Sequence, residues 1–262
     1  MTLEGKVFIS TVSAGKSAEI RNIFQPLGAT VVDCPMTAVV GSDLTPQVKE
    51  VMINLGKFHW IIFTSANGVI FFHRFLQQSG NSTMLPPKIK VAVVGPKTAL
   101  ALEKTGRTAD FTGSGDSAES LLDELIENFS MEGSEILLPL GNLAPETLEI
   151  GLSEIAVTTR MNVYHTIKTN IRDTTPFNLV KSNRYDLVLF TSPSGVLNFS
   201  DTLGTEIENQ GVRAAAIGKV TSRAVDKQGY SCLVTASTST YQGLADEIVN
   251  YYKSKNRSYV LS

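Results

Sequence analysis

The segment HWIIFTSANGV, residues 59–69, is the strongest indication of the fold, because the segment YDLVLFTSPSGV at residues 185–196 repeats it. Two further pairs follow in the same order: VVGPKT (93–98) matches AIGKVT (216–221), and SLLDEL (120–125) matches GLADEI (243–248). Self-similarity at a nearly constant separation is typical of a repeated structural unit. The sequence therefore predicts one set of units that occurs twice in the chain.

Each unit has the pattern of a buried strand followed by a helix. A short run rich in Val, Ile and Phe is typical of a parallel strand that is covered on both faces. Each run then breaks into Ser, Thr, Gly or Pro before a helical pattern, as the N-terminus of a helix requires. Strands that alternate with helices imply βαβ units. We expect an α/β protein with two similar doubly wound parallel-sheet domains.

The order of the units predicts that one domain is inserted into the other. Residues 54–163 contain the strand segments WIIFTS, KVAVVG, TADFTG, EILLPL and TTRMNVY, whereas the second copy has only DLVLFTS, RAAAIG and SCLVTA near the C-terminus. The N-terminal segments KVFIST and ATVVDCP fit the slots of EILLPL and TTRMNVY. We therefore expect a discontinuous outer domain (1–36 and 172–262), an inserted domain (54–163) and two interdomain linker strands (37–53 and 164–171). Two thin connections predict motion between the lobes.

The composition is that of a soluble globular protein, with 42% apolar and 18% charged residues. The net charge of −2 and the lack of a Lys/Arg run argue against nucleic-acid and membrane partners. Cys34 and Cys232 lie outside any Cys-x-x-Cys motif, so we expect two reduced, buried thiols. The first residues lack a signal-peptide pattern and the apolar runs are only strand-length, so we expect a cytoplasmic protein. We also expect a monomer.

Turns rich in Gly, Ser and Thr follow the predicted strands, and ligands of open parallel sheets bind at this edge. Backbone N–H groups at helix N-termini, with hydroxyls beside them, suit anions. For any single turn, capping of its own helix is the better explanation; for the whole set on two facing lobes, a shared anionic ligand is better. The candidate ligand-binding residues are Thr64, Ser65, Asn67, Gly95, Thr98, Ser114, Asn142, Ser192, Ser194, Gly218 and Thr221.

Motifs for metal, nucleophilic or nucleotide-dependent catalysis are absent from the sequence. It contains no G-x-S-x-G elbow, no P-loop and no G-x-G-x-x-G fingerprint, and its three His residues lack ligand spacing. We therefore expect no metal and no cofactor. Tyr164, in NVYHT at residues 162–166, lies where the inserted lobe passes back to the other. Packing is one role for such a tyrosine, but its place beside the expected cleft makes it the best candidate for a proton donor.

Six short segments, in order, resemble the uroporphyrinogen-III synthase family over nearly the full chain. They are FTS (63–65), VGPKTA (94–99), GNL (141–143), VYHT (163–166), FTSPSGV (190–196) and IGKVT (217–221). The inserted-domain layout is also that of the family. Two positions depart from its pattern: TVS (11–13) stands where members often have Arg-Pro, and APE (144–146) stands where many carry a basic residue.

The resemblance implies an enzyme of tetrapyrrole and haem biosynthesis, a lyase that needs no metal or cofactor. Members convert the linear hydroxymethylbilane into uroporphyrinogen III, with inversion of the terminal pyrrole ring and elimination of water. The substrate is a polycarboxylate, which suits the anion-binding turns. The family's tyrosine, matched by Tyr164, is thought to help the hydroxyl leave, while control of the two reacting ends supplies most of the acceleration. Transient contact with the preceding bilane-forming enzyme is implied as well.

Two alternatives use the same features. A non-catalytic, two-lobed cytoplasmic binding protein would close on an anionic small molecule with the same turns. A nucleotide-dependent transferase or reductase of the Rossmann type would share the order of strands and helices, but the glycine fingerprint is missing.

Overall fold

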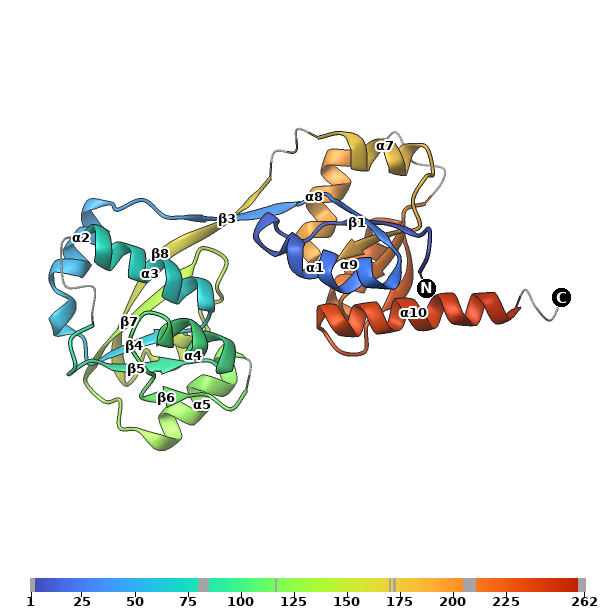
Figure 1. The fold of residues 1–262 in the computed structure, drawn as a ribbon. Helices are drawn as coiled ribbons and strands as arrows, with labels where there is room; N and C mark the ends of the chain where they lie inside the picture. The colour runs from blue at the N-terminus through green and yellow to red at the C-terminus, as the bar shows by residue number, and fades with distance from the viewer. Residues whose placement is uncertain are drawn as a thin grey trace. The chain divides into compact units, whose positions relative to one another are not determined.

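The chain folds into two compact α/β units. The computed structural model describes residues 3–79, 85–115, 117–169, 171, 173–204 and 211–258, with the backbone alone for 256–258. The outer unit consists of Met1–Ala38 and Ile167–Ser262, and the inserted unit is Val39–Thr166. Each unit is built on parallel strand pairs with helices against both faces of its sheet (Figure 1). The predicted fold class is therefore confirmed.

The inserted unit contains a six-stranded sheet in the order β3-β8-β7-β4-β5-β6. The pairings from β8 to β6 are all parallel. Its strands are β3 (Thr37–Gly41), β4 (Trp60–Phe63), β5 (Lys90–Val93), β6 (Phe111–Thr112), β7 (Ser134–Gly141) and β8 (Ala156–Lys168). Its helices are α2 (Pro46–Ile53), α3 (Ala66–Gln78), α4 (Pro96–Glu103), α5 (Ala118–Asn128) and α6 (Thr147–Leu152), with a 3₁₀ turn at Leu55–Lys57.

Two hydrophobic cores cover the faces of this sheet, because successive strand side chains point to opposite sides. Ile61 and Phe63 of β4 pack with α2, α3 and α4. Trp60 and Ile62 of the same strand pack with α5 and α6. All four side chains are at most 3% exposed, and full burial of one such side chain contributes about 1.5–3 kcal/mol. A strand that is apolar at every position therefore takes a central place in the sheet.

The outer unit contains a five-stranded sheet in the order β11-β10-β9-β1-β2, with every described pairing parallel. Its strands are β1 (Val7–Ser10), β2 (Thr30–Asp33), β9 (Leu187–Phe190), β10 (Arg213–Ala216) and β11 (Ser231–Thr235). Its helices are α1 (Ser17–Phe24), α7 (Thr175–Lys181), α8 (Pro193–Leu203), α9 (Lys219–Lys227) and α10 (Tyr241–Ser258), with 3₁₀ turns at Ala14–Lys16 and Gln25–Leu27. Helices α1 and α10 cover one face and α7, α8 and α9 the other. No described helix, α10 included, is long and apolar enough to span a membrane.

The outer sheet repeats the inserted sheet with strands from both ends of the chain. Strands β9, β10 and β11 take the positions of β4, β5 and β6, while β1 and β2 take those of β7 and β8. The prediction that two N-terminal strands complete the second copy is confirmed. The central strand β9 is buried at all four positions, and it pairs with β10 on one side and with β1 on the other.

The chain passes between the units within β3 and at the end of β8. Residues 37–53, predicted as a linker strand, hold β3 and then the helix α2. The helix starts there because Pro46 occupies its first turn and Thr45 Oγ1 accepts a hydrogen bond from Val48 N. The second predicted linker range, 164–171, begins inside β8.

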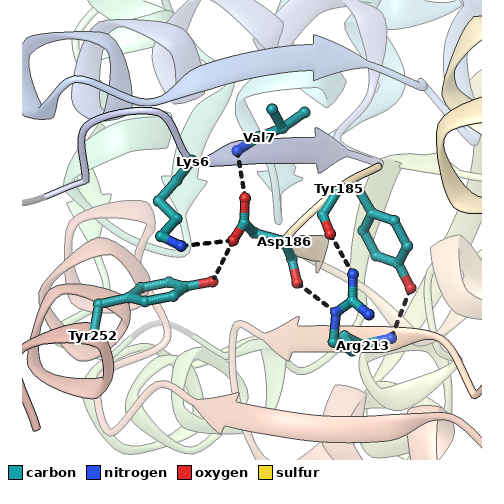
Figure 2. A network of polar contacts seen from close by, with 6 residues as sticks. All are labelled: Lys6, Val7, Tyr185, Asp186, Arg213 and Tyr252. Atoms are coloured by element: carbon teal, nitrogen blue, oxygen red, sulfur yellow. Dashed lines mark hydrogen bonds and ion pairs between the residues drawn. The ribbon is translucent and has the colours of Figure 1, made fainter. Parts of the chain in front are cut away.

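Asp186 ties together the amino-terminal end of the outer sheet (Figure 2). Its carboxylate accepts hydrogen bonds from Val7 N at 2.8 Å and from Lys6 Nζ at 3.0 Å. Tyr252 of α10 donates to the same carboxylate at 3.4 Å. These contacts join β1, the start of β9 and α10, which lie far apart in the sequence. In the inserted unit His59 has the corresponding place, where its Nδ1 accepts from Glu135 N at 3.0 Å.

Arg213 extends this network to β10 (Figure 2). Its guanidinium donates to the backbone oxygens of Tyr185 and Asp186 and stacks on the Tyr185 ring, 4.5 Å from the ring centre. The Tyr185 hydroxyl in turn accepts from Arg213 N at 3.0 Å. The contacts lie at the end of the sheet opposite the turns that carry the predicted ligand-binding residues, so we assign them to stability.

Candidate active site

Tyr164 lies near the end of β8, half-buried, with its hydroxyl 3.2 Å from Ser65 Oγ. Ser65 is the N-cap of α3, where its Oγ accepts from Gly68 N at 3.0 Å. The Phe71 ring of the same helix stacks on the Tyr164 ring, with centres 5.8 Å apart. The phenol is therefore held by one hydrogen bond and one ring contact, both from α3.

Gly141 makes room for the Tyr164 ring. A Cβ at this position would lie 2.5 Å from Tyr164 Cε2 and 2.7 Å from its Oη, closer than carbon and oxygen atoms approach without a bond. The strand register shifts between Leu140 and Gly141, so that Gly141 pairs with Tyr164. Any larger residue at 141 would push the ring away from this place.

The turn after β7 is held in place by Asn142. Its backbone N–H donates to Tyr164 O at 3.1 Å, and its side-chain Oδ1 accepts from Thr166 N at 2.8 Å. Asn142 thus bonds to the backbone of β8 at Tyr164 and at Thr166. Asn142 was predicted to bind ligand, and in the structure its side-chain oxygen is hydrogen-bonded to the strand that carries Tyr164.

Arg160 holds the same turn from β8 and was not predicted from the sequence. Its Nη2 donates to Gly141 O and Ala144 O, each at 3.0 Å, and its Nη1 pairs with Glu149 at 2.7 Å. Its Nε also donates to Asn162 Oδ1 at 3.0 Å. The sequence feature that could have indicated Arg160 is a cation on the same predicted strand as Tyr164. All of these donors are used for structure, so Arg160 positions the turn and does not offer a free charge.

A pocket of about 330 Å³ opens beside these residues in the inserted unit. Its polar lining comes from the ends of β4 and β8 and from the first turn of α5: Thr64, Ser65, Tyr164, Thr166, Ser117 and Glu119. Its apolar lining includes Leu140, Leu143 and Leu148. The described residues contain no group of three or more His, Cys, Asp or Glu side chains placed to hold a metal ion.

Glu119 is the one carboxylate that lines this pocket in the part of the chain that the structure describes. The backbone N–H at the start of α5, then the hydroxyls of Ser117 and Thr147, lower the pKa of its carboxyl below the usual value. The side chain is therefore ionised at neutral pH. The pocket combines a phenol, several hydroxyls and one negative charge, which suits protonation of a leaving group and stabilisation of a cation.

The chain matches the family model described as "Uroporphyrinogen-III synthase HemD" over residues 18–246. It belongs to this family. A uroporphyrinogen-III synthase from Chlorobaculum parvum is 30% identical over 179 residues, which cover 67% of this chain and 72% of that protein. One from Synechococcus elongatus is 27% identical over 253 residues, which cover 92% and 94% of the two chains.

Solved uroporphyrinogen III synthases share the fold. A mutant of the enzyme from the extremely thermophilic bacterium Thermus thermophilus aligns with a TM-score of 0.65 and 18% identity, covering 95% of this chain and 100% of that one. The enzyme from Helicobacter pylori aligns with a TM-score of 0.61 and 16% identity, covering 94% and 99%. At this identity the likeness supports the fold, and the residues have to be judged from their own contacts.

Of the candidate residues from the sequence, the inserted unit brings Thr64, Ser65, Asn142 and Tyr164 together. Asn67 is the second residue of α3, two positions after Ser65, and it does not line the pocket. Gly95 is buried at the start of α4, and the Thr98 side chain is only 3% exposed. For this family member, Thr98 therefore packs inside the unit in the described conformation.

Ser114 has its donors already engaged. Its hydroxyl donates to the carboxylate of Glu124, and its backbone N–H donates to the same group at 2.9 Å. These bonds, the hydroxyl first, lower the pKa of the Glu124 carboxyl. The outer unit repeats the arrangement, since Ser237 donates to Glu247 at 2.8 Å. The Glu124 carboxylate of the protein itself thus occupies the turn at which Ser114 was predicted to bind the ligand.

The outer-unit candidates follow the same pattern as their partners in the repeat. Ser192 caps α8 by accepting from Gly195 N at 3.1 Å, and its hydroxyl lies 3.1 Å from that of Ser194. Gly218 is buried at the start of α9, and Thr221 is 4% exposed. Helix capping, the alternative weighed for each single turn, is thus observed for both Ser65 and Ser192.

Proposed function

We propose that the protein is a uroporphyrinogen-III synthase. It would convert hydroxymethylbilane into uroporphyrinogen III by eliminating water, inverting the terminal pyrrole ring and closing the macrocycle. Family membership over residues 18–246 carries the proposal, and the Tyr164 phenol at the pocket supports it, because the reaction needs a proton for its departing hydroxyl. We further expect a cytoplasmic monomer that receives its substrate from the preceding bilane-forming enzyme.

In this reaction Tyr164 would act as the general acid. Its phenolic proton joins the hydroxyl that leaves the first ring, so that water departs and an azafulvene cation remains. Ser65 can support the phenolate that forms, because its oxygen accepts from Gly68 N and its own proton remains to be donated to Tyr164. The proton that the terminal ring loses when its aromaticity is restored returns to the phenolate. Protons are thereby balanced over one turnover.

Glu119 would stabilise the cation. A carboxylate that stays ionised in the same pocket lowers the energy of a positive charge that develops there. It would also repel the substrate's own carboxylates, so we expect Glu119 to contribute to the rate of the chemical step and not to strengthen substrate binding. The pocket's remaining contribution is to hold the two reacting ends near each other.

The substrate's carboxylates need donors that are still free. We propose Thr64 and the exposed backbone of the turns that follow β4 and β7 in the inserted unit. For Ser192, Ser194, Gly218 and Thr221 of the outer unit, and for Asn67, Gly95, Thr98 and Ser114, carboxylate binding stays a prediction.

The decisive experiment supplies the purified protein with freshly made hydroxymethylbilane and separates the product isomers by chromatography. We expect isomer III in excess of isomer I, which forms spontaneously without inversion. A product ratio equal to that of buffer alone would overturn the proposal. Tight binding of the bilane without turnover would favour the two-lobed binding protein instead. In the same assay Tyr164→Phe should lower kcat while the circular dichroism spectrum stays unchanged.

A further inference from the structure

A second hollow of about 420 Å³ lies on the surface of the inserted unit, between the neighbouring helices α3 and α4. We call it the α3–α4 groove. Two apolar side chains line it in the open, Ile70 at 43% and Leu100 at 54% exposure. Three cations line it as well: Arg74 from α3, and Lys97 and Lys104 from α4 and its C-cap. Its lining thus pairs apolar surface with positive charge.

The cations of the groove have no carboxylate partner among the described residues, whose ion pairs all lie elsewhere. The Arg74 guanidinium lies over the Phe71 ring, 4.6 Å from its centre. Clustered like charges repel one another, so a fold gains nothing from placing them together without an anion. The groove is therefore complementary to a ligand that has an apolar body and negative groups.

The internal repeat shows that the fold does not require cations at these particular positions, although α9 carries Lys219 and Arg223 where α4 has Pro96 and Leu100. In the outer unit α8 and α9 pack together as α3 and α4 do. The residue that matches Arg74 is there Asp201, and the residue that matches Lys97 is Val220. Asp201 forms an ion pair with Lys168 at 3.1 Å. Of the three cations, only Lys104 has a counterpart of the same charge, Lys227.

The groove adjoins the candidate active site. Ala66, which lines the groove, directly follows Ser65, which lines the pocket. A chain of stacked groups also joins the two, because Arg74 covers Phe71 and Phe71 stacks on Tyr164. A linear ligand with one end at Tyr164 can therefore continue along α3.

We propose that the α3–α4 groove binds a carboxylate-bearing pyrrole of the linear substrate, outside the pocket that holds its reacting end. This inference rests on the proposed function. A pocket of about 330 Å³ is at the lower limit for enclosing even a drug-sized molecule, so a chain of four substituted rings must extend beyond it. The ring would lie on Ile70 and Leu100, and its carboxylates would pair with Lys97 and Lys104.

The kinetic test uses Lys97→Glu and Lys104→Glu, with Lys227→Glu as the matched control. All three replace an exposed lysine on the second helix of a repeat pair and change the net charge equally. Arg74 is left intact, because its change would disturb Phe71 and Tyr164. We expect each groove variant to raise KM for free hydroxymethylbilane about 10-fold, with kcat changed less than about 2-fold, since charge reversal replaces an attraction by a repulsion. The control should leave KM within about 2-fold.

A second readout does not depend on turnover. Wild-type protein is acetylated with an amine-reactive reagent, with and without a single pyrrole that carries one acetate, one propionate and no amine, so that the probe does not consume the reagent. Mass spectrometry should show Lys97 and Lys104 protected at least about 3-fold and Lys227 unchanged. Protection without isomer III formation would retain the groove as a pyrrole site and reject the synthase.

An active wild-type enzyme whose groove variants keep normal KM would overturn the groove proposal alone. The same holds if Lys97→Glu and Lys104→Glu are slow only when the bilane-forming enzyme supplies the substrate. In that case the groove would bind the partner enzyme and not the pyrrole.

Discussion

Replacement of Gly141 by Ala tests whether the placement of the Tyr164 hydroxyl sets the rate. The new Cβ would lie 2.5 Å from Tyr164 Cε2, whereas ordinary contact begins at 3.4 Å, so the ring has to move by about 0.9 Å. The hydrogen bond from Tyr164 to Ser65 is already 3.2 Å long, so a shift of this size away from Ser65 breaks it, and a shift in another direction changes its geometry. A misplacement of about 1 Å can cost on the order of 100-fold in rate. We therefore expect Gly141→Ala to lower kcat about 100-fold and KM to change little.

The assay is the rate of isomer III formation at saturating hydroxymethylbilane, corrected for spontaneous isomer I. Gly151→Ala is the matched control, because its Cβ would also clash, but with the Leu122 side chain away from Tyr164. Both variants should lose about 1–3 kcal/mol of stability through overpacking, as measured by urea unfolding. Only Gly141→Ala should lose the rate.

A double-mutant cycle with Tyr164→Phe decides the cause. If Gly141 acts through the tyrosine hydroxyl, Gly141→Ala should have little further effect on kcat in the Tyr164→Phe background. Full additivity of the two losses would refute this reasoning, as would a Gly141→Ala enzyme with normal kcat.

Three further predictions concern other parts of the molecule. Glu119→Gln should lower kcat roughly 3-fold without raising KM, and a raised KM with normal kcat in steady-state assays would contradict this. Because the pKa of the Glu119 carboxyl is lowered, its contribution should be fully present at neutral pH and be lost only as the pH falls through that lowered pKa, below the ordinary value of 4.5. Burial, followed by the nearby charge of Asp173, raises the pKa of the Cys34 thiol to about 12 from 9.0, so its thiolate fraction at pH 8 is about 1000-fold smaller; an aromatic disulfide reagent should label only Cys232 in the native protein, and rapid labelling of both thiols would disprove this. Asp186→Ala should lower the free energy of unfolding by about 2 kcal/mol, because it leaves backbone and hydroxyl donors without an acceptor, and kcat should stay normal. A loss below about 0.5 kcal/mol in urea titrations would show that the network does not stabilise the fold.

The burial of the two cysteines differs from the prediction. Both thiols were expected to be buried. Cys34 is buried, but Cys232 is only half-buried, so the expectation is wrong for the second one. Cys232 lies on β11, at the edge of the outer sheet, where one side has no neighbouring strand among the described residues. The sequence pattern of a strand does not state whether it lies at an edge.

Much of the site depends on residues that are distant in the sequence. Turn chemistry indicated Thr64 and Ser65. The place of Tyr164 where the inserted lobe passes back to the other, together with the family resemblance, indicated Tyr164. The contact from Ser65 to Tyr164 spans 99 positions, and no local pattern contains it. Arg160 was missed because its partners are backbone oxygens, which leave no mark on side-chain identity. Ser114 was predicted to bind the ligand because it lies in a turn after a strand. The carboxylate that occupies this turn comes from Glu124, ten positions away on the next helix, and the turn's own sequence does not indicate that contact.

The repeat, the βαβ order and the insertion of one copy into the other could all be predicted from the sequence. These follow from hydrophobic periodicity and turn residues, which act over short stretches and survive in both copies. Three features are visible only in the folded protein: which hydroxyls stay free, which turns are occupied by the protein's own carboxylates, and that the Tyr164 ring packs against Gly141. The fold also gathers Arg74, Lys97 and Lys104 into one groove. Such properties depend on distances through space between packed elements, and a linear sequence does not contain those distances.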